Sequence, residues 1–457
     1  MRTALARPLA VLLAIVLFVT AAAPGAEAQR RQKGPSLVRD AEIEALMRTY
    51  AGPLMKAAGL RTGSVRFYIV NDDSFNAFVS GNGLFMHTGL LLQAQTPGEV
   101  IGVVAHELGH ITGGHQQRLR ERAAQAMRLA QITTLLGIGL GAAGAAAGIR
   151  NAGAAGLGVA AGGRNIAIRD LLRYQREEET AADRAAVRLL RQTGQSGQGM
   201  IKTFKRLARQ TSLLAGRIDP YLVSHPMPNQ RIAALRDTLS ASPHWNRKDG
   251  AALRLRHDMA RAKIAAYLGG SRYARSLLAG KELHPDARLY GRAIVAHLYS
   301  SPKNAIPLID KLIARMPKNA YVWEMKGEIY LRSGRPKQAV SAFRRAIALD
   351  RTKAGFLRVE LGHALVEAGG RKNLEEARRE LRKGLTADPS AVGGWRYLAR
   401  AEADLGNEPG ALLASAELSL RTGRRAEARS FAKRAQNGLK RGTPQWLRAE
   451  DIRTIGR

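Results

Sequence analysis

The chain has no cysteine among its 457 residues. This absence excludes disulfide bonds, thiolate metal sites, cysteine nucleophiles and a lipid-modified cysteine behind a signal peptide. Aromatic residues make up only 5% of the sequence, and no basic stretch is interleaved with them as a single-strand nucleic-acid binder requires. We therefore expect no nucleic-acid partner.

Acidic residues are scarce beside basic ones. The sequence has 37 Asp and Glu against 72 Lys and Arg, a formal net charge of +35. Such a surplus favours anionic partners such as lipid headgroups. An anionic membrane surface is therefore a candidate partner, and a solvated arginine-rich surface is the alternative.

Residues 1–28 have the pattern of a secretory signal peptide. Arg2 and Arg7 precede an uncharged apolar run at residues 9–19, and Ala26-Glu27-Ala28 fits a cleavage site. The apolar run is shorter than the ~20 residues that a membrane span needs, which disfavours an uncleaved anchor. Together with the missing cysteines, this segment predicts export to a bacterial periplasm.

Residues 29–248 are expected to form a mainly helical domain with a small β-hairpin or sheet. Helical spacing of apolar residues covers 40–58, and alternating apolar residues predict strands within 65–69, 75–79 and 84–87. Thr96, Pro97 and Glu99 predict a helix start, with Thr96 as cap and Glu99 completing a capping box.

An apolar insertion at residues 129–163 interrupts this domain. Residues 129–149 carry no charge, and their length permits a membrane span, but five glycines make them a poor ordinary helix in water. We expect a helical hairpin or a re-entrant flap that contacts a bilayer. A mobile glycine-rich loop over the active site is the alternative.

Residues 249–457 show an internal repeat. The residues from Trp323 to Ala346 have the offsets of the tetratricopeptide (TPR) helix pair of about 34 residues, and these offsets recur from Trp395 to Leu418. A slightly longer unit lies between them, and weaker copies cover 289–317 and begin again at Gly423. The pattern predicts an α-solenoid of TPR helix pairs, with a generic helical array as the alternative for the outer units.

The stretch VVAHELGHITGGH, residues 103–115, predicts a metal site. His106 and His110 are four apart and share one face of the predicted helix, and Glu107 between them can reach a water beside the same cation. A catalytic zinc usually takes a third protein ligand. His115 lies too far round the helix to be that ligand, and we expect it to be structural.

The third ligand is therefore expected to be a carboxylate from another helix. The run from Tyr174 to Asp183 is the best candidate, because Glu179 and Asp183 share a helical face, so that one can bind the metal and the other can hold a ligating histidine. Composition alone leaves Glu177, Glu178 and Glu179 open.

Five segments together resemble the HtpX/BepA type of gluzincin metalloprotease, in matching order and spacing over roughly residues 36–240. They are Asn76–Val79, His87–Leu91, Val104–His115, Glu179–Asp183 and Ser224–Pro226. The C-terminal repeats are similar to those of exported members with a TPR domain. The resemblance implies that Glu179, in an E-x-x-x-D pattern, is the third ligand of one Zn²⁺ per chain. It also implies hydrolysis of misfolded envelope proteins.

The mechanism follows from this set of ligands. Zinc lowers the pKa of its water and polarises the substrate carbonyl, while Glu107 takes the proton of the water and gives it to the leaving amine. A further donor is needed for the negative intermediate, and His225 and Arg231 are the candidates. His225 has a second interpretation, in which it occupies the open metal position and keeps the enzyme latent.

The segment Asn76, Ala77 and Phe78 is expected to lie at an exposed strand edge beside the cleft. An unfolded peptide can bind there by adding a strand, a mode that reads backbone rather than sequence.

These features predict an exported zinc endopeptidase for misfolded or unassembled envelope proteins. Its TPR domain is expected to dock unfolded polypeptides or an envelope protein complex. The alternative is a TPR chaperone or adaptor for envelope protein assembly that carries a latent protease domain.

Overall fold

The structure is a computed structural model that describes residues 36–61, 63–213, 225 and 229–455. The chain divides into two units, residues 1–37 and residues 38–457, and the elements that follow belong to the second unit from Val38 onward. The predicted signal peptide, residues 1–28, lies outside the described residues.

A four-stranded sheet forms the β part of the first domain. Its strands, in the order β1-β2-β4-β3, are β1 (Leu37–Val38), β2 (Arg66–Val70), β4 (Gly83–His87) and β3 (Ala77–Ser80). β2 and β4 are parallel, with Phe67 opposite Leu84, while β3 and β4 form an antiparallel hairpin with Phe78 opposite Phe85. The strand predictions are confirmed, and β3 lies at the edge of the described sheet.

One helix, α4 (Pro97–Gly113), passes through the apolar core of this domain. Its residues from Val100 to Leu108 are all buried, and α4 packs chiefly against α6 (Ala152–Gln192), α7 (Gln198–Leu213), α2 (Ala41–Ala57) and strand β3. The domain also contains α3 (Thr88–Gln93) and α9 (Asn229–Ser240). A residue between Val100 and Leu108 of α4 therefore lies in the interior of the domain.

The start of α4 differs from the sequence prediction at its cap. Thr96 is the N-cap residue and Pro97 occupies the first turn, both as expected, but the Thr96 side chain makes no capping hydrogen bond, so that part of the prediction is wrong. Instead, the Glu99 carboxylate accepts hydrogen bonds from the Gln95 backbone N–H at 3.1 Å and from the Thr96 hydroxyl at 3.3 Å. The Glu99 carboxylate therefore accepts hydrogen bonds from both residues that directly precede α4.

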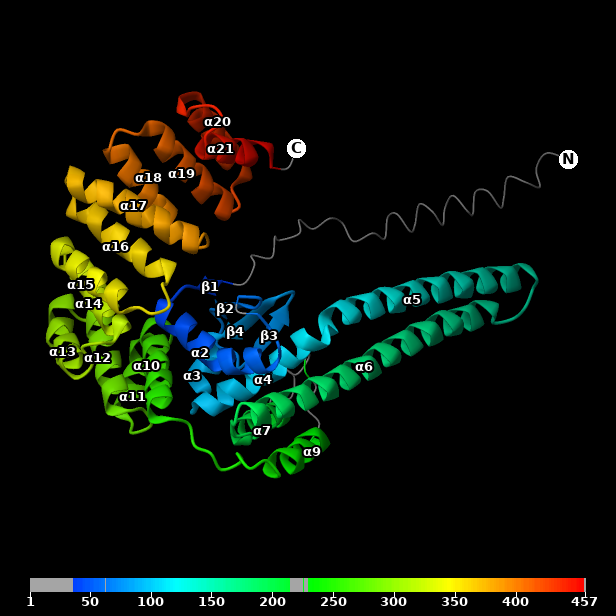
Figure 1. The fold of residues 1–457 in the computed structure, drawn as a ribbon. Coiled ribbons are helices and arrows are strands. Elements are labelled where there is room, and N and C mark those ends of the chain that lie inside the picture. Colours follow the sequence, from blue (N-terminus) through cyan, green and yellow to red (C-terminus); the bar gives the residue numbers. More distant parts are fainter. Residues whose placement is uncertain (1–35, 62, 214–224, 226–228, 456–457) are drawn as a thin grey trace. The chain divides into compact units, whose positions relative to one another are not determined.

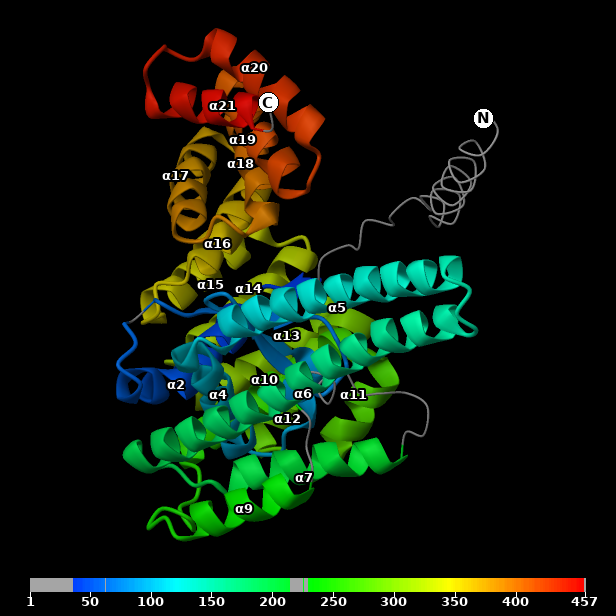
Figure 2. The same cartoon turned by 90° about the vertical axis from the view of Figure 1, so that its right-hand side faces the viewer.

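The apolar insertion is a helical hairpin. α5 (His115–Ala146) and α6 (Ala152–Gln192) are two long helices that lie side by side, as Figures 1 and 2 show from two directions. They pack through small residues: an added Cβ on Gly137 would lie 2.3 Å from the Gly156 carbonyl oxygen. The helical-hairpin prediction is confirmed and the glycine-rich loop is wrong, whereas contact with a bilayer stays a prediction.

Paired helices follow one another from residue 251 to residue 454 (Figure 1). They are α10 (Ala251–Leu268), α11 (Gly270–Ala279), α12 (Pro285–Tyr299), α13 (Pro302–Arg315), α14 (Ala320–Arg332), α15 (Pro336–Leu349), α16 (Gly355–Ala368), α17 (Arg371–Ala387), α18 (Val392–Asp404), α19 (Glu408–Arg421), α20 (Arg425–Gly438) and α21 (Pro444–Thr454). Small residues lie where paired helices cross: an added Cβ on Gly327 would lie 2.8 Å from the Phe343 ring. The α-solenoid is confirmed, and the predicted boundary at 248/249 stays a prediction.

Candidate metal centre

Helices α4 and α6 carry most of the predicted site, and His225 and Arg231 join it from later in the chain. His106, Glu107 and His110 lie on α4 and are buried in the core. One helical turn separates the two histidines, which places their Nε2 atoms 3.1 Å apart. The two imidazoles therefore converge on a single point, as the sequence predicted.

Glu179 on α6 completes this arrangement. Its Oε1 lies 3.3 Å from His110 Nε2, and its Oε2 lies 3.3 Å from His106 Nε2. The two neighbouring glutamates point elsewhere: Glu177 pairs with Arg173, and Glu178 pairs with His115 and Arg118. Of the three carboxylates that composition left open, Glu179 is the one beside the two histidines.

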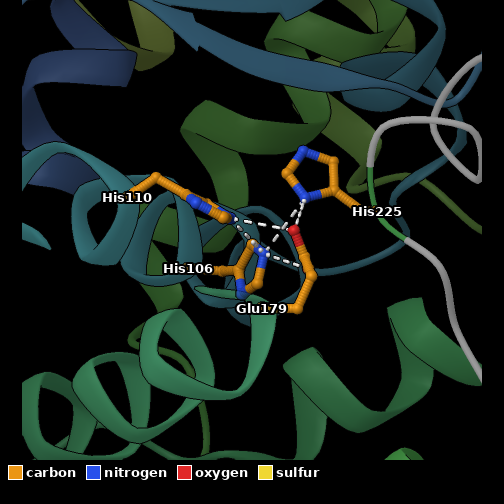
Figure 3. A group of neighbouring side chains, drawn as sticks. All are labelled: His106, His110, Glu179 and His225. Carbon is orange, nitrogen blue, oxygen red and sulfur yellow. Dashed lines mark hydrogen bonds and ion pairs between the residues drawn. The ribbon is translucent and has the colours of Figure 1, made fainter. Parts of the chain in front are cut away.

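His225 is the fourth residue of this cluster. Its Nδ1 lies 2.8 Å from Glu179 Oε1 and 3.4 Å from His106 Nε2, and its Nε2 lies 3.6 Å from Glu107 Oε1. Each of the four residues His106, His110, Glu179 and His225 offers one donor atom, and these atoms all lie within 4.8 Å of one another (Figure 3). This separation and this mixture of imidazole and carboxylate fit one divalent transition metal.

Asp183 holds His106 from behind. Its Oδ1 lies 2.9 Å from His106 Nδ1, one helical turn beyond Glu179 on α6. A carboxylate at Nδ1 fixes the proton there and leaves the Nε2 lone pair free for a metal.

His115 holds His110 in the same way, which the sequence reasoning missed. His115 Nε2 lies 2.8 Å from Glu178 Oε2, and its Nδ1 lies 2.9 Å from His110 Nδ1. If His115 donates to Glu178, its Nδ1 accepts the proton of His110 Nδ1, and His110 Nε2 is then free for a metal. The signal that could have revealed this contact is Gly113-Gly114.

These two glycines allow the chain to fold back. Gly114 ends α4 with φ 65°, in the left-handed region that favours glycine, and α5 begins at the next residue. A Cβ on Gly113 would lie 2.0 Å from the His115 ring. His115 is therefore brought beside His110 although it is no longer on the same helix.

Arg231 on α9 binds the two acidic residues of α6. Its Nη1 lies 2.8 Å from Glu179 Oε2, and its Nη2 donates to Asp183 Oδ1 at 2.8 Å. The guanidinium thus neutralises the carboxylates and fixes their position. Its predicted role as a donor to a reaction intermediate stays a prediction.

Burial and neighbouring charges shift the pKa values of Glu107, Glu179 and Asp183 in different directions. Burial raises the pKa of Glu107, against weaker effects of His225 and His106. Burial also acts on Glu179, but the charge of His225 and hydrogen bonding to His106 hold the pKa of Glu179 well below its usual value. For Asp183, hydrogen bonds from Arg231 and His106 outweigh burial and lower the pKa. Glu107 is therefore the carboxyl group of this cluster whose surroundings favour proton uptake.

A cavity of about 390 Å³ opens beside the cluster. Its walls are formed by Asn76, Phe78, Val79, Glu107, His110, His115, Gln116, Leu119, Gln175, Glu178, Glu179 and His225. Among the described residues, Asn76 Oδ1 and both carboxylate oxygens of Glu107 are buried without a hydrogen-bond partner. Such orphaned acceptors are costly unless a ligand or water satisfies them.

The fold and this geometry agree with comparisons to known proteins. Residues 38–239 match the family "Peptidase family M48", and residues 320–353 match "Tetratricopeptide repeat". The chain carries a peptidase family M48 domain. It is therefore a metalloprotease, as the sequence predicted, with a TPR region after the peptidase domain.

Several curated proteins are similar to this chain over part or most of its length. The beta-barrel assembly-enhancing protease of Escherichia coli (strain K12) is 27% identical over 391 residues, which cover 84% of this chain and 76% of the relative. The protein of the same name from Yersinia pestis is 26% identical, over 92% of this chain and 84% of the relative. The metalloprotease LoiP of Escherichia coli (strain K12) is 28% identical over 38% of this chain and 62% of the relative.

Solved structures resemble this chain only loosely. The TPR protein YrrB, described as having an unusual peptide-binding site, has a TM-score of 0.31 at 19% identity, covering 40% of this chain and 92% of YrrB. Yeast Tom70 has a TM-score of 0.33 at 14% identity, covering 64% of this chain and 60% of Tom70.

Proposed function

We propose that the protein is an exported zinc endopeptidase that hydrolyses peptide bonds of misfolded or unassembled envelope proteins. The observation that carries the proposal is the convergence of His106, His110 and Glu179 beside the buried carboxyl group of Glu107. The relatives that are named beta-barrel assembly-enhancing proteases support a substrate in the envelope. The TPR region is proposed to dock substrates or an envelope protein complex.

In this proposal His106, His110 and Glu179 hold one Zn²⁺, and Asp183 orients His106. Zinc fits this set of two imidazoles and one carboxylate, which is a donor set that catalytic zinc takes. When bound, it supplies Lewis acidity that lowers the pKa of a water molecule and polarises the substrate carbonyl.

Glu107 is the proposed general base. Its carboxylate oxygens are buried and lack a hydrogen-bond partner among the described residues, so they are available to accept a proton from the attacking water. The raised pKa of Glu107 suits this uptake and the later return of the proton to the leaving amine.

Asn76, Ala77 and Phe78 are the proposed substrate-binding segment. Phe78 and Asn76 line the cavity, and β3 is the edge of the described sheet, so a peptide that adds a strand there would lie along the catalytic groups. Asn76 Oδ1 offers a buried acceptor for a backbone N–H of that peptide. A survey of cleavage sites is expected to find weak sequence preference, and a strict preference would contradict this mode.

His225 gives the protein two proposed states. In one, its ring donates to the negative intermediate together with Arg231. In the other, it takes the open metal position, which its distance of 2.8 Å from Glu179 and its place in the four-residue cluster support. Replacing His225 is expected to change the rate of casein cleavage, by loss or by release of latency, and an unchanged rate would remove it from the site.

The decisive experiment is casein cleavage by the wild type and by Glu107→Gln, with zinc content measured in both. We expect cleavage by the wild type, loss of at least 100-fold in the variant and equal zinc content. Equal cleavage by the two proteins would refute the assignment. If neither cleaves although both hold zinc, the alternative of a TPR chaperone or adaptor with a latent protease domain is favoured.

The hairpin of α5 and α6 is proposed to contact an anionic membrane. It is arranged inside out, with glycines at the helix contact and large apolar side chains exposed to the surroundings; Leu135 and Leu157 are each 70% exposed. Residues 129–146 would span about 27 Å at ~1.5 Å per residue, close to the ~30 Å of a hydrocarbon core. Of the described residues, α5 is the one helix long and apolar enough to cross a membrane.

Sedimentation with phosphatidylglycerol-containing vesicles tests this contact. We expect salt-sensitive binding that falls in a Leu135→Ser, Leu157→Ser double variant, and unchanged binding in the control Leu447→Ser, whose side chain is 51% exposed on α21. Equal binding by all three proteins would contradict a role of the hairpin. A periplasmic location, reached by cleavage after residue 28, is proposed from the sequence and is checked by amino-terminal sequencing of the mature protein.

A further inference from the structure

A second cavity lies in the repeat region, far along the sequence from the metal centre. Its volume is about 760 Å³, and it is lined by residues of α14, α15, α16 and α18 together with Gly334. The lining is contributed chiefly by the first helices of three consecutive pairs. A cavity of this size accommodates several residues of a bound chain rather than one small ion.

The wall of this cavity is rich in acidic residues, whereas the chain as a whole is basic. Glu324 and Glu328 lie one turn apart on α14, and Glu360 and Glu367 lie on α16, all in the cavity wall. The basic groups of the wall are Arg332, which is exposed, and the imidazole of His363. In a protein with twice as many basic as acidic residues, four carboxylates in one cavity form a marked local excess of negative charge.

Glu324 is an acidic group buried in the cavity wall. Its side chain has 6% exposure, and its Oε2 has no hydrogen-bond partner among the described residues. Burial raises the pKa of Glu324, and the charge of Lys263 opposes this only in part, because the Lys263 ammonium is held by Asp40 at 2.6 Å and Glu42 at 3.3 Å. A buried carboxylate oxygen without a partner is costly, and a ligand that brings a positive charge would remove that cost.

The other carboxylates differ in how far they are already satisfied. Glu328 accepts a hydrogen bond from the Tyr267 hydroxyl at 2.7 Å and lies 3.2 Å from His297 Nε2. Glu367 pairs with Arg400 at 2.6 Å, whereas Glu360 lies 4.0 Å from His363 Nδ1. Glu324 and Glu360 are thus the carboxylates with most capacity left for a ligand.

Aromatic rings complete the wall. Tyr397 of α18 stacks on His363, with ring centroids 3.8 Å apart and planes 12° apart, and Phe356 lies in the same wall. Rings of this kind pack against the methylene stem of a long side chain and attract a cation over their faces. Carboxylates beside aromatic rings therefore fit lysine and arginine side chains better than they fit a bare metal ion.

We propose that this cavity binds an extended polypeptide segment through its lysine or arginine side chains, with Glu324 and Glu360 as the receiving carboxylates. The inference rests on the docking role proposed above for the repeats, and it gives that role a ligand of defined charge. It does not rest on the protease activity.

The test measures binding of a fluorescein-labelled eight-residue peptide of glycine and alanine that carries two lysines, followed by fluorescence anisotropy. The full chain is used with Glu107→Gln, so that the probe cannot be cleaved. We expect binding that weakens with added salt and that falls at least tenfold when both lysines are acetylated. Glu324→Gln with Glu360→Gln should weaken binding of the lysine peptide at least tenfold.

The matched control is Glu375→Gln, because Glu375 lies on α17 outside the cavity and pairs with Arg371. It should bind the lysine peptide as the parent does. If the double variant does not fold, as judged by circular dichroism, Glu360→Gln alone should still weaken binding, since Glu360 is partly exposed.

Several outcomes would overturn the proposal. Equal binding of the lysine and acetyl-lysine peptides, or equal binding by the parent and the cavity variants, would rule out cation recognition here while leaving the casein result untouched. Spermidine that binds more tightly than the peptide would assign the cavity to a free polyamine. Self-association of the parent that the cavity variants abolish would assign it to a second copy of this chain. Binding of the peptide, together with failure of the wild type to cleave casein, would support docking and refute only the protease proposal.

Discussion

The two histidines proposed as metal ligands, His106 and His110, each have a partner at Nδ1. Asp183 lies behind His106, and His115, itself held by Glu178, lies behind His110. A neutral imidazole carries one proton, so a partner at Nδ1 determines that Nε2 presents its lone pair. Both Nε2 atoms then face the same point, which preorganises the site for a cation.

The contact between His115 and His110 leads to the first prediction. His115→Phe retains the buried ring but loses the contact to His110 Nδ1, so the affinity for zinc should fall about 10- to 100-fold. The measurement is a competition for zinc with a chelator, together with casein cleavage at saturating zinc. The control is Gln117→Ala, a change on the exposed face of α5, and equal affinity of all three proteins would show that His115 has only a packing role.

The three consecutive glutamates give the second prediction. Glu179→Gln removes the carboxylate that lies 3.3 Å from both histidines, so the purified variant should lose zinc and casein cleavage together. Glu177→Gln should leave both unchanged, because Glu177 is exposed and pairs with Arg173 on the same helix. Loss of zinc in Glu177→Gln but not in Glu179→Gln would identify Glu177 as the ligand in place of Glu179.

At the scale of helices, the site depends on how closely α4 and α6 approach. Gly109 lies between the two proposed ligands of α4, and a Cβ there would lie 2.7 Å from the Ala182 carbonyl oxygen and 2.9 Å from Ala182 Cα. Ala182 immediately precedes Asp183. The glycine in HELGH therefore allows the helix that carries Glu179 and Asp183 to reach the histidines.

The third prediction follows from this close approach. Gly109→Ala should push α6 away from α4, lower the free energy of unfolding by about 1–3 kcal/mol and weaken zinc binding. Thermal unfolding and zinc content measure the two effects. Gly139→Ala on α5 is the matched control: an added Cβ there meets nothing within 4 Å, so stability should be unchanged or slightly higher. Full zinc occupancy and unchanged stability of Gly109→Ala would contradict this account.

At the scale of the whole molecule, α10 joins the peptidase domain to the helices that follow. His257 of α10 lies 2.8 Å from the Tyr50 hydroxyl of α2 and 2.8 Å from the Ala94 carbonyl oxygen. Lys263 of the same helix pairs with Asp40 and Glu42. Buried polar contacts of this kind tie the two parts together, because breaking them leaves unpaired groups in the interior.

His257 gives the fourth prediction, a dependence of stability on pH. Burial lowers the pKa of His257 from 6.5 to about 3, so the folded protein keeps it neutral while the unfolded chain takes up a proton. This contribution is complete above pH 6.5 and is lost as the pH falls toward 3, at up to ~1.4 kcal/mol per pH unit. In thermal unfolding between pH 7 and pH 5, wild type should therefore lose more stability than His257→Gln.

The control for this measurement is His244→Gln, a histidine-to-glutamine change outside the contacts of α10 with Tyr50 and Ala94. It should follow the pH dependence of the wild type. Identical curves for the wild type and His257→Gln would show that His257 is charged in the folded state or does not contribute.

Local patterns in the sequence predicted many of the helices and strands. The i, i+4 spacing of His106 and His110 requires only that the segment be helical, and the alternation of apolar residues requires only a half-buried strand. The repeat offsets from Trp323 to Ala346 and from Trp395 to Leu418 likewise predicted helix pairs. The cap of α4 was predicted less well, because several donors compete locally for one carboxylate.

Contacts between residues distant in sequence could be seen only in the tertiary structure. Three adjacent glutamates have the same charge and the same helical propensity, and only the rotation of α6 against α4 brings Glu179 to the histidines. His115 was expected to be structural, but its contact with His110 depends on the reversal of the chain at Gly114. The acidic cavity of the repeats arises from side chains on α14, α16 and α18, which no local pattern joins. Sequence alone thus determined the chemical groups and their local spacing, whereas packing determined which of them meet, because a contact depends on the relative position of whole elements.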